Sequence, residues 1–243
     1  MPREKRSYEL TERKIHEDKL YTSKWLKQDN AREFYFSKDP VNAGYSVYKK
    51  RSAQIKPGIT VLVGCNGSGK STLLNIMKDI LKKEDIPVFT YDNYRNGGLM
   101  GLDIALEHNA RLFATLAFSS EGERIVQNFG AYMRSFGDFV RRHQSDKEIW
   151  LILDAVESGL SIDNVRELKE FFQFVLENEA QGDKSIFIVV STNTYEFCTG
   201  TQCYDVQNGK YIELKTYDEY CDFIMKSREL KDNLKAKAMG GRR

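Results

Sequence analysis

The hydrophobic pattern of this chain is a series of short apolar runs separated by segments with helical periodicity. The run GITVLVG is rich in β-branched residues and is bounded by glycines, which is typical of a strand buried in a parallel sheet. Residues 202–214 are typical of a hairpin, because Asn208 and Gly209 supply the positive φ of a tight turn. The buried strands predicted from the apolar runs are residues 58–64, 86–92, 148–154 and 184–192.

Helical periodicity fills the intervals between these strands. Residues 70–83 carry apolar side chains at helical spacing, and amphipathic patterns predict further helices over residues 164–180 and 217–237. A long helical stretch over residues 98–143 is interrupted near residues 118–124. The alternation predicts an α/β fold of the doubly wound type, in which helices flank a central, mostly parallel sheet and one helical lobe is inserted.

The pattern divides the chain into three regions. Residues 1–43 are expected to form a polar N-terminal extension that could contain a β-strand. Residues 44–216 are expected to form the main domain, with the inserted helical lobe at about residues 97–145. Residues 217–243 are expected to form a C-terminal helix with a basic tail.

Composition narrows the class of protein. The 243 residues are 41% hydrophobic and 30% charged, as in a soluble globular protein, and the longest apolar runs are too short to span a bilayer. The charged N-terminal segment lacks the apolar stretch of a secretory signal, so we expect a cytoplasmic location and no direct membrane insertion. The four cysteines form no CxxC pair and only three histidines accompany them, so a zinc site is not expected. Basic clusters at residues 1–6, 48–51 and 235–243 are solvated tails or contacts to DNA phosphates.

Residues 64–71, GCNGSGKS, match the phosphate-loop pattern G-x-x-x-x-G-K-[ST] at every position, between a predicted strand and a predicted helix. Glycines let the backbone fold around phosphates with its amides pointing inward, and the helix N-terminus adds positive potential. Lys70 is expected to reach the β- and γ-phosphates of ATP, and the hydroxyl of Ser71 to bind Mg²⁺. The residues expected to contact ATP in this segment are Gly64, Asn66, Gly67, Ser68, Gly69, Lys70, Ser71 and Thr72.

Two later motifs resemble the ABC superfamily of ATPases. The segment FSSEGER resembles the signature motif in its Ser-x-Gly-Glu form, which is found in the non-transporter branch with SMC and RecF-like proteins, and Ser120, Gly122 and Glu123 occupy its defining positions. The segment LILDAVESGLS resembles the Walker B strand and the D-loop, with Asp154 as the residue of the metal site. The resemblance covers residues 45–214.

This resemblance implies a shared site. In the family, two domains enclose two ATP molecules head to tail, and the signature motif of one subunit contacts the γ-phosphate bound by the other. The resemblance therefore implies a homodimer through the nucleotide interface, with Ser120, Gly122 and Glu123 as ATP contacts.

The chain departs from the family pattern at three positions. Ala155 stands where a catalytic glutamate usually follows the Walker B aspartate, and Asn193 stands where a histidine usually contacts the γ-phosphate. The family's glutamine after the second strand is absent, and Asn93 is the candidate for that polar metal or water contact. Glu157 is the nearest replacement carboxylate, or else a member of the ESGL turn. Loss of a general base commonly slows a reaction by about 10²- to 10⁴-fold, so slow hydrolysis is expected.

These observations favour a slow ABC-type ATPase that acts as a nucleotide-dependent clamp or switch on DNA or on a partner protein. The alternative from another class is a regulatory subunit that binds ATP and does not hydrolyse it, which Ala155 and Asn193 both favour. A kinase would use the inserted helical stretch as a basic lid, but it leaves the ESGLS segment and the order of the motifs unexplained. A transporter ATPase fits the degenerate signature motif poorly.

Overall fold

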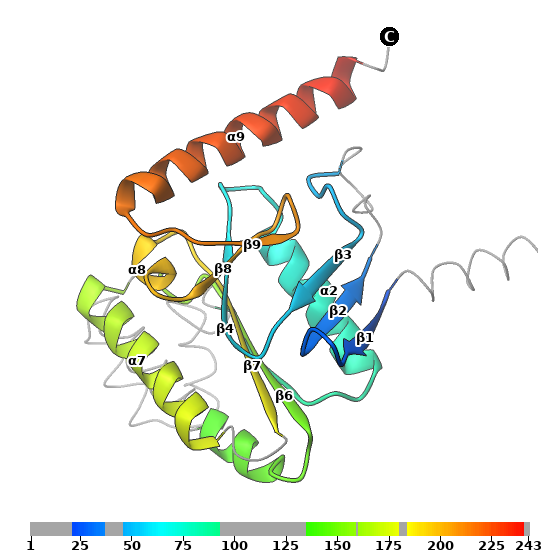
Figure 1. Ribbon diagram of the computed structural model, residues 1–243, viewed down its shortest axis with the longest axis vertical. Coiled ribbons are helices and arrows are strands. Elements are labelled where there is room, and N and C mark those ends of the chain that lie inside the picture. Colours follow the sequence, from blue (N-terminus) through cyan, green and yellow to red (C-terminus); the bar gives the residue numbers. More distant parts are fainter. Residues whose placement is uncertain (1–20, 37–45, 93–134, 159, 180–183, 241–243) are drawn as a thin grey trace, which may run out of the picture.

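The computed structural model describes residues 21–36, 46–92, 135–158, 160–179 and 184–240 (Figure 1). Its centre is a sheet of six strands in the order β5-β6-β7-β4-β8-β9. Neighbouring strands are parallel except for β8 and β9, which are antiparallel. The strands are β4 (Gly58–Val63), β5 (Val88–Asp92), β6 (Glu148–Asp154), β7 (Ser185–Ser191), β8 (Gln202–Asp205) and β9 (Lys210–Ile212).

Helices cover both faces of this sheet, as predicted from the alternating pattern. The helices are α2 (Lys70–Lys83), α7 (Ile162–Glu179), α8 (Tyr195–Cys198) and α9 (Tyr217–Gly240), and residues 135–142 are also helical. In Figure 1, α2 and α7 lie on opposite sides of the central strands. The α/β fold with a mostly parallel sheet flanked by helices is therefore confirmed. The remainder of the predicted inserted lobe lies outside the described residues.

Alternation along β6 shows why both faces are covered. Leu151 and Leu153 pack into a cluster with α7, whereas Trp150 and Ile152 pack into a second cluster with α2. Successive side chains of a strand point to opposite faces, so a strand that is apolar at nearly every position must be covered on both sides. This accounts for the continuous apolar runs in the sequence.

A small antiparallel sheet extends the cluster that contains α2. It consists of β1 (Thr22–Leu26), β2 (Ala31–Tyr35) and β3 (Ser52–Ile55), in the order β1-β2-β3. Phe34 of β2 is fully buried, and its ring meets the edge of the Trp150 ring at 5.3 Å between centroids. β1 and β2, which both lie within residues 1–43, belong to the packed structure.

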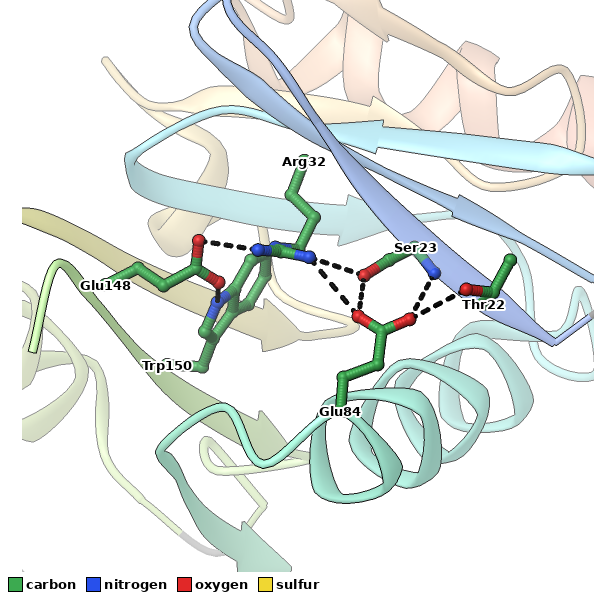
Figure 2. A network of polar contacts seen from close by, with 6 residues as sticks. All are labelled: Thr22, Ser23, Arg32, Glu84, Glu148 and Trp150. Carbon is green, nitrogen blue, oxygen red and sulfur yellow. Dashed lines mark hydrogen bonds and ion pairs between the residues drawn. The ribbon is translucent and has the colours of Figure 1, made fainter.

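Polar contacts fasten this small sheet to α2 and β6 (Figure 2). The guanidinium group of Arg32 donates to Glu148 at 2.8 Å, to Glu84 at 3.3 Å and to the hydroxyl of Ser23 at 2.6 Å. Glu84, the residue that caps the C-terminus of α2, also accepts a hydrogen bond of 2.6 Å from the amide of Ser23. Charge-assisted hydrogen bonds of this kind fix orientation as well as adding stability.

No helix in the described part of the chain is long and apolar enough to cross a membrane.

Candidate nucleotide site

The phosphate loop connects the end of β4 to the start of α2. Gly67 and Gly69 have φ angles of 75° and 98°, in a region that L-residues with a side chain rarely adopt. A Cβ atom at Gly69 would also lie 2.6 Å from the hydroxyl of Tyr48, which donates a hydrogen bond of 2.6 Å to the Gly69 carbonyl. The glycine pattern is therefore required by both backbone conformation and close packing.

Lys70 is the first residue of α2 and lies beneath the loop. Its side chain is 8% exposed, and its Nζ donates to the carbonyl of Gly64 at 2.7 Å and to Oδ1 of Asn193 at 2.9 Å. Burial lowers the pKa of this ammonium group from its ordinary value. The sequence-predicted residues Lys70 and Asn193 are thus brought together, although they are far apart in the chain. With the N-terminus of α2, they form a positively polarised place for an anion.

Asp154 ends β6 at the same edge of the sheet. Its Oδ1 accepts a hydrogen bond of 3.0 Å from the hydroxyl of Ser71 and a second from the hydroxyl of Ser191. Ser191 was not predicted from the sequence, although it ends the adjacent strand in register with Asp154 and could have been found from that position. A serine hydroxyl beside one carboxylate suits Mg²⁺, which retains several waters and uses few protein ligands.

The chain turns immediately after Asp154. Ala155 has a φ angle of 50°, and its amide donates to the Ser191 hydroxyl at 3.2 Å. The Ala155 carbonyl then accepts a hydrogen bond of 3.0 Å from the amide of Ser158. An alanine methyl at this position accepts no proton, so the residue that follows the strand cannot act as a general base.

Glu157 points from this turn towards the loop after β7. Its Oε1 accepts a hydrogen bond of 2.8 Å from the Asn193 amide, and its Oε2 is buried with no hydrogen-bond partner among the described residues. Burial raises the pKa of Glu157, an effect that the Asn193 hydrogen bond opposes. Glu157 therefore belongs to the turn and also lies beside the residue that contacts Lys70.

The raised pKa predicts how stability depends on pH. Below the ordinary value of 4.5, Glu157 is protonated in both states, and its favourable contribution to folding is fully present. That contribution is lost as the pH rises through the folded-state pKa, because ionisation is harder in the folded protein. A neutral Glu157→Gln variant should therefore gain free energy of unfolding relative to the wild type between pH 4.5 and neutrality, as measured by urea denaturation. Glu167→Gln, on the exposed face of α7, is the control and should not show this change with pH. If the free energy of unfolding of Glu157→Gln differs from that of the wild type by the same amount at pH 4.5 and at neutral pH, the prediction is contradicted.

Other predicted contacts are placed differently. Ser68 is buried, and its hydroxyl has no hydrogen-bond partner among the described residues. Asn66 and Thr72 are exposed at the loop and at the first turn of α2. The remaining predicted residues, Asn93, Ser120, Gly122 and Glu123, lie outside the described residues.

Helix α9 also contacts the phosphate loop, which sequence reasoning did not anticipate. The amide of Cys65 donates to the hydroxyl of Ser227 at 2.9 Å, and Nζ of Lys231 donates to the Asn66 carbonyl at 3.0 Å. Ser227 and Lys231 share a helical face with Tyr220 and Ile224, so a polar pair within an apolar stripe was the available signal.

The sequence matches the AAA domain family over residues 54–196, which is more than half of the chain. The chain belongs to the AAA domain family. The matched segment runs from the end of β3 past Asn193, so it contains the phosphate loop and the strand that ends at Asp154. This AAA domain is accordingly a P-loop NTPase. Comparison with curated protein sequences gave no match.

Solved structures similar to this AAA domain include two ATP-binding cassettes of ABC transporters. One is nucleotide-free, with 15% identity and a TM-score of 0.42 over 83% of this chain and 96% of that chain. The other is in its ADP conformation, with 13% identity and a TM-score of 0.44 over 87% of this chain and 96% of that chain. Cdc6p from Pyrobaculum aerophilum has 16% identity and a TM-score of 0.31 over 58% of this chain and 34% of that chain.

Proposed function

We propose that this protein is an ABC-type ATPase that binds ATP with Mg²⁺, hydrolyses it slowly, and uses it to hold two copies of the chain together. The observation that carries the proposal is that a complete phosphate loop places Lys70 against Asn193 and Ser71 against Asp154. Ala155 stands directly after Asp154, where a catalytic base is expected. Such a protein acts as a nucleotide-dependent clamp or switch on DNA or on a partner protein.

The residues around the loop support ATP and Mg²⁺ as ligands. The loop amides and Lys70 would hold the phosphates, because they combine a helix N-terminus with a buried ammonium group. Ser71 and Asp154 would hold Mg²⁺, since a hydroxyl and a carboxylate oxygen already meet there. The ion, when bound, neutralises charge that develops on the transferred phosphoryl group.

Slow ATP hydrolysis is expected because few side chains near the phosphate loop can orient the attacking water. Asn193 can donate a hydrogen bond to a phosphate but carries no charge. Glu157 is the nearest carboxylate, and one of its oxygens is already held by the Asn193 amide. Most of the catalysis in phosphoryl transfer comes from positioning and electrostatics, which the loop retains, so hydrolysis is slowed rather than abolished.

The ATP-enclosing dimer is supported by the resemblance of FSSEGER to a signature motif and of ESGLS to a D-loop. The non-hydrolysing regulatory subunit remains the second candidate, and the specific observation that favours it is the alanine methyl of Ala155 directly after Asp154. The two candidates differ in turnover and agree in ATP binding.

The proposal is tested by measuring turnover together with molecular mass. We expect slow ATP hydrolysis that falls further in Glu157→Gln, and a doubling of mass on addition of ATP and Mg²⁺, measured with and without DNA. Brisk turnover that Glu157→Gln leaves unchanged would contradict slow hydrolysis. A monomer under every condition would contradict the dimer, and a doubled mass with no turnover in the wild type would favour the regulatory subunit.

A further inference from the structure

Two cysteines meet at the turn that joins α8 to β8 (Figure 1). Cys198 ends α8, and Cys203 lies in β8. Gly200, between them, has a φ angle of 65°, which glycine adopts readily and which reverses the chain after the helix. The S–H of Cys203 is thereby returned to the carbonyl oxygen of Cys198, to which it donates at 3.7 Å. The turn therefore places two thiols together in the core.

The two side chains also contact each other. A hydrogen bond between the thiols lowers the pKa of Cys203 and raises the pKa of Cys198, because the Cys198 S–H donates to the Cys203 sulfur once that sulfur is ionised. Nζ of Lys169 donates to the carbonyl of Glu196 at 3.2 Å and to the carbonyl of Thr199. Its positive charge also lowers the pKa of Cys203, whereas burial acts in the opposite direction. The pair thus combines a nucleophile, Cys203, with a thiol that can supply a proton, Cys198.

A cavity of about 600 Å³ lies against the same turn. Cys198, Gly200 and Gln202 line one side of it, and β9 with the residues that follow lines the other. The side chains of Cys198 and Cys203 are only 1% and 0% exposed, so a small, uncharged oxidant suits this site better than a bulky one. A metal site needs more ligands than two thiols, and among the described residues no group of three or more His, Cys, Asp or Glu is placed to hold an ion.

We propose that Cys198 and Cys203 form a reversible disulfide bond when the protein meets hydrogen peroxide. The Cys203 thiolate attacks one oxygen of the peroxide and the O–O bond breaks, which gives a sulfenic acid at Cys203 and hydroxide. The hydroxide becomes water by taking up the proton that Cys203 had lost. The Cys198 sulfur then attacks the sulfenic sulfur, the S–O bond breaks, and the hydroxyl group leaves as water with the Cys198 thiol proton. The two sulfurs are oxidised, the peroxide is reduced to water, and an added dithiol reverses the change. The proposal is independent of nucleotide binding.

The test is mass spectrometry of the full-length wild type after treatment with hydrogen peroxide, a denaturing quench and alkylation with iodoacetamide. Trypsin releases residues 185–210 as one peptide, which contains Cys198 and Cys203 and no other cysteine. We expect peroxide to leave this peptide unalkylated and about 2 Da lighter than its reduced form, because a disulfide has two hydrogen atoms fewer than two thiols. Dithiothreitol added before alkylation should restore both alkylated cysteines.

Cys221→Ser is the matched control, because it removes a half-buried thiol outside the pair and should leave the result unchanged. Dimedone, which labels sulfenic acids, should label Cys203 in Cys198→Ala more than it labels Cys198 in Cys203→Ala, since Cys203 reacts first. Labelling in the reverse order would overturn that assignment. The proposal itself would be overturned if peroxide oxidised Cys221 while Cys198 and Cys203 both stayed open to alkylation. Bonds between two chains, or a sulfinic acid at Cys203 without any disulfide, would overturn it as well.

Discussion

Lys70→Ala should weaken ATP binding at least about tenfold and by as much as about a hundredfold, because hydrogen bonds to a charged group are worth about 1.5–3 kcal/mol. In the structure its Nζ contacts Gly64 and Asn193, the two sides of the space that the phosphates would occupy. Burial lowers the pKa of this ammonium group from its ordinary value, so keeping it charged in that position costs free energy of folding. Such a cost is typical of a group kept for binding.

The affinity of Lys70→Ala is best measured by isothermal titration calorimetry with ATP and Mg²⁺. Lys78→Ala is the matched control, since Lys78 lies two turns along α2 and bonds only to Asn75 among the contacts described. Thermal unfolding of both variants confirms that each is folded. If Lys70→Ala and Lys78→Ala bind ATP equally well, the phosphate loop is not the nucleotide site.

Trp150→Ala should lower the free energy of unfolding by about 3–5 kcal/mol, the usual cost of deleting a large buried aromatic side chain. Trp150 is fully buried and stacks on Phe187 with ring centroids 3.9 Å apart and planes 4° from parallel. It also meets Phe34 of the small sheet and donates its indole N–H to Glu148 at 3.0 Å. Its removal therefore opens a cavity where the two sheets and α2 meet.

Urea denaturation measures this loss directly. Trp150→Phe should lower the free energy of unfolding by less than half as much as Trp150→Ala, because the buried aromatic ring is retained. The remaining loss comes from the smaller ring and from the missing hydrogen bond to Glu148. Phe174→Ala is the control for an aromatic deletion at the surface, since Phe174 is 61% exposed, and it should change stability by less than about 0.5 kcal/mol. A similar loss for Trp150→Ala and Phe174→Ala would contradict the central position assigned to Trp150.

The central strands could be predicted from the sequence because their burial leaves a local trace. β6 was predicted at residues 148–154 and occupies Glu148–Asp154, and α2 begins at Lys70 as the phosphate-loop pattern requires. In β6 and α2, the residues that determine the element lie within one short segment of the sequence, so the element can be predicted without knowing the rest of the fold. The meeting of Lys70 with Asn193 follows from topology, because β4 and β7 are parallel neighbours that end at the same edge.

The N-terminal strands and the position of α9 left no such trace. Only Ala31 and Phe34 of β2 are fully buried, which is too few apolar positions to predict the strand from the sequence. Their burial depends on the packing of the small sheet against Trp150. Ser227 stands out in the sequence only as a polar residue within an apolar stripe, and the stripe does not indicate that its hydroxyl contacts the Cys65 amide. The positive φ of Ala155 likewise depends on the turn that brings Glu157 to Asn193. Each of these features is fixed by contacts between segments that are distant in the chain.

The most direct test of the account is to follow the nucleotide on the protein itself. The wild type would be incubated with radiolabelled ATP and Mg²⁺, separated rapidly from unbound nucleotide, and the ratio of ATP to ADP retained would be measured over time. We predict that the protein retains the label mainly as ATP, with slow conversion to ADP, because Ala155 supplies no base beside Asp154. Failure to retain any nucleotide, or rapid conversion of the retained ATP to ADP, would contradict it.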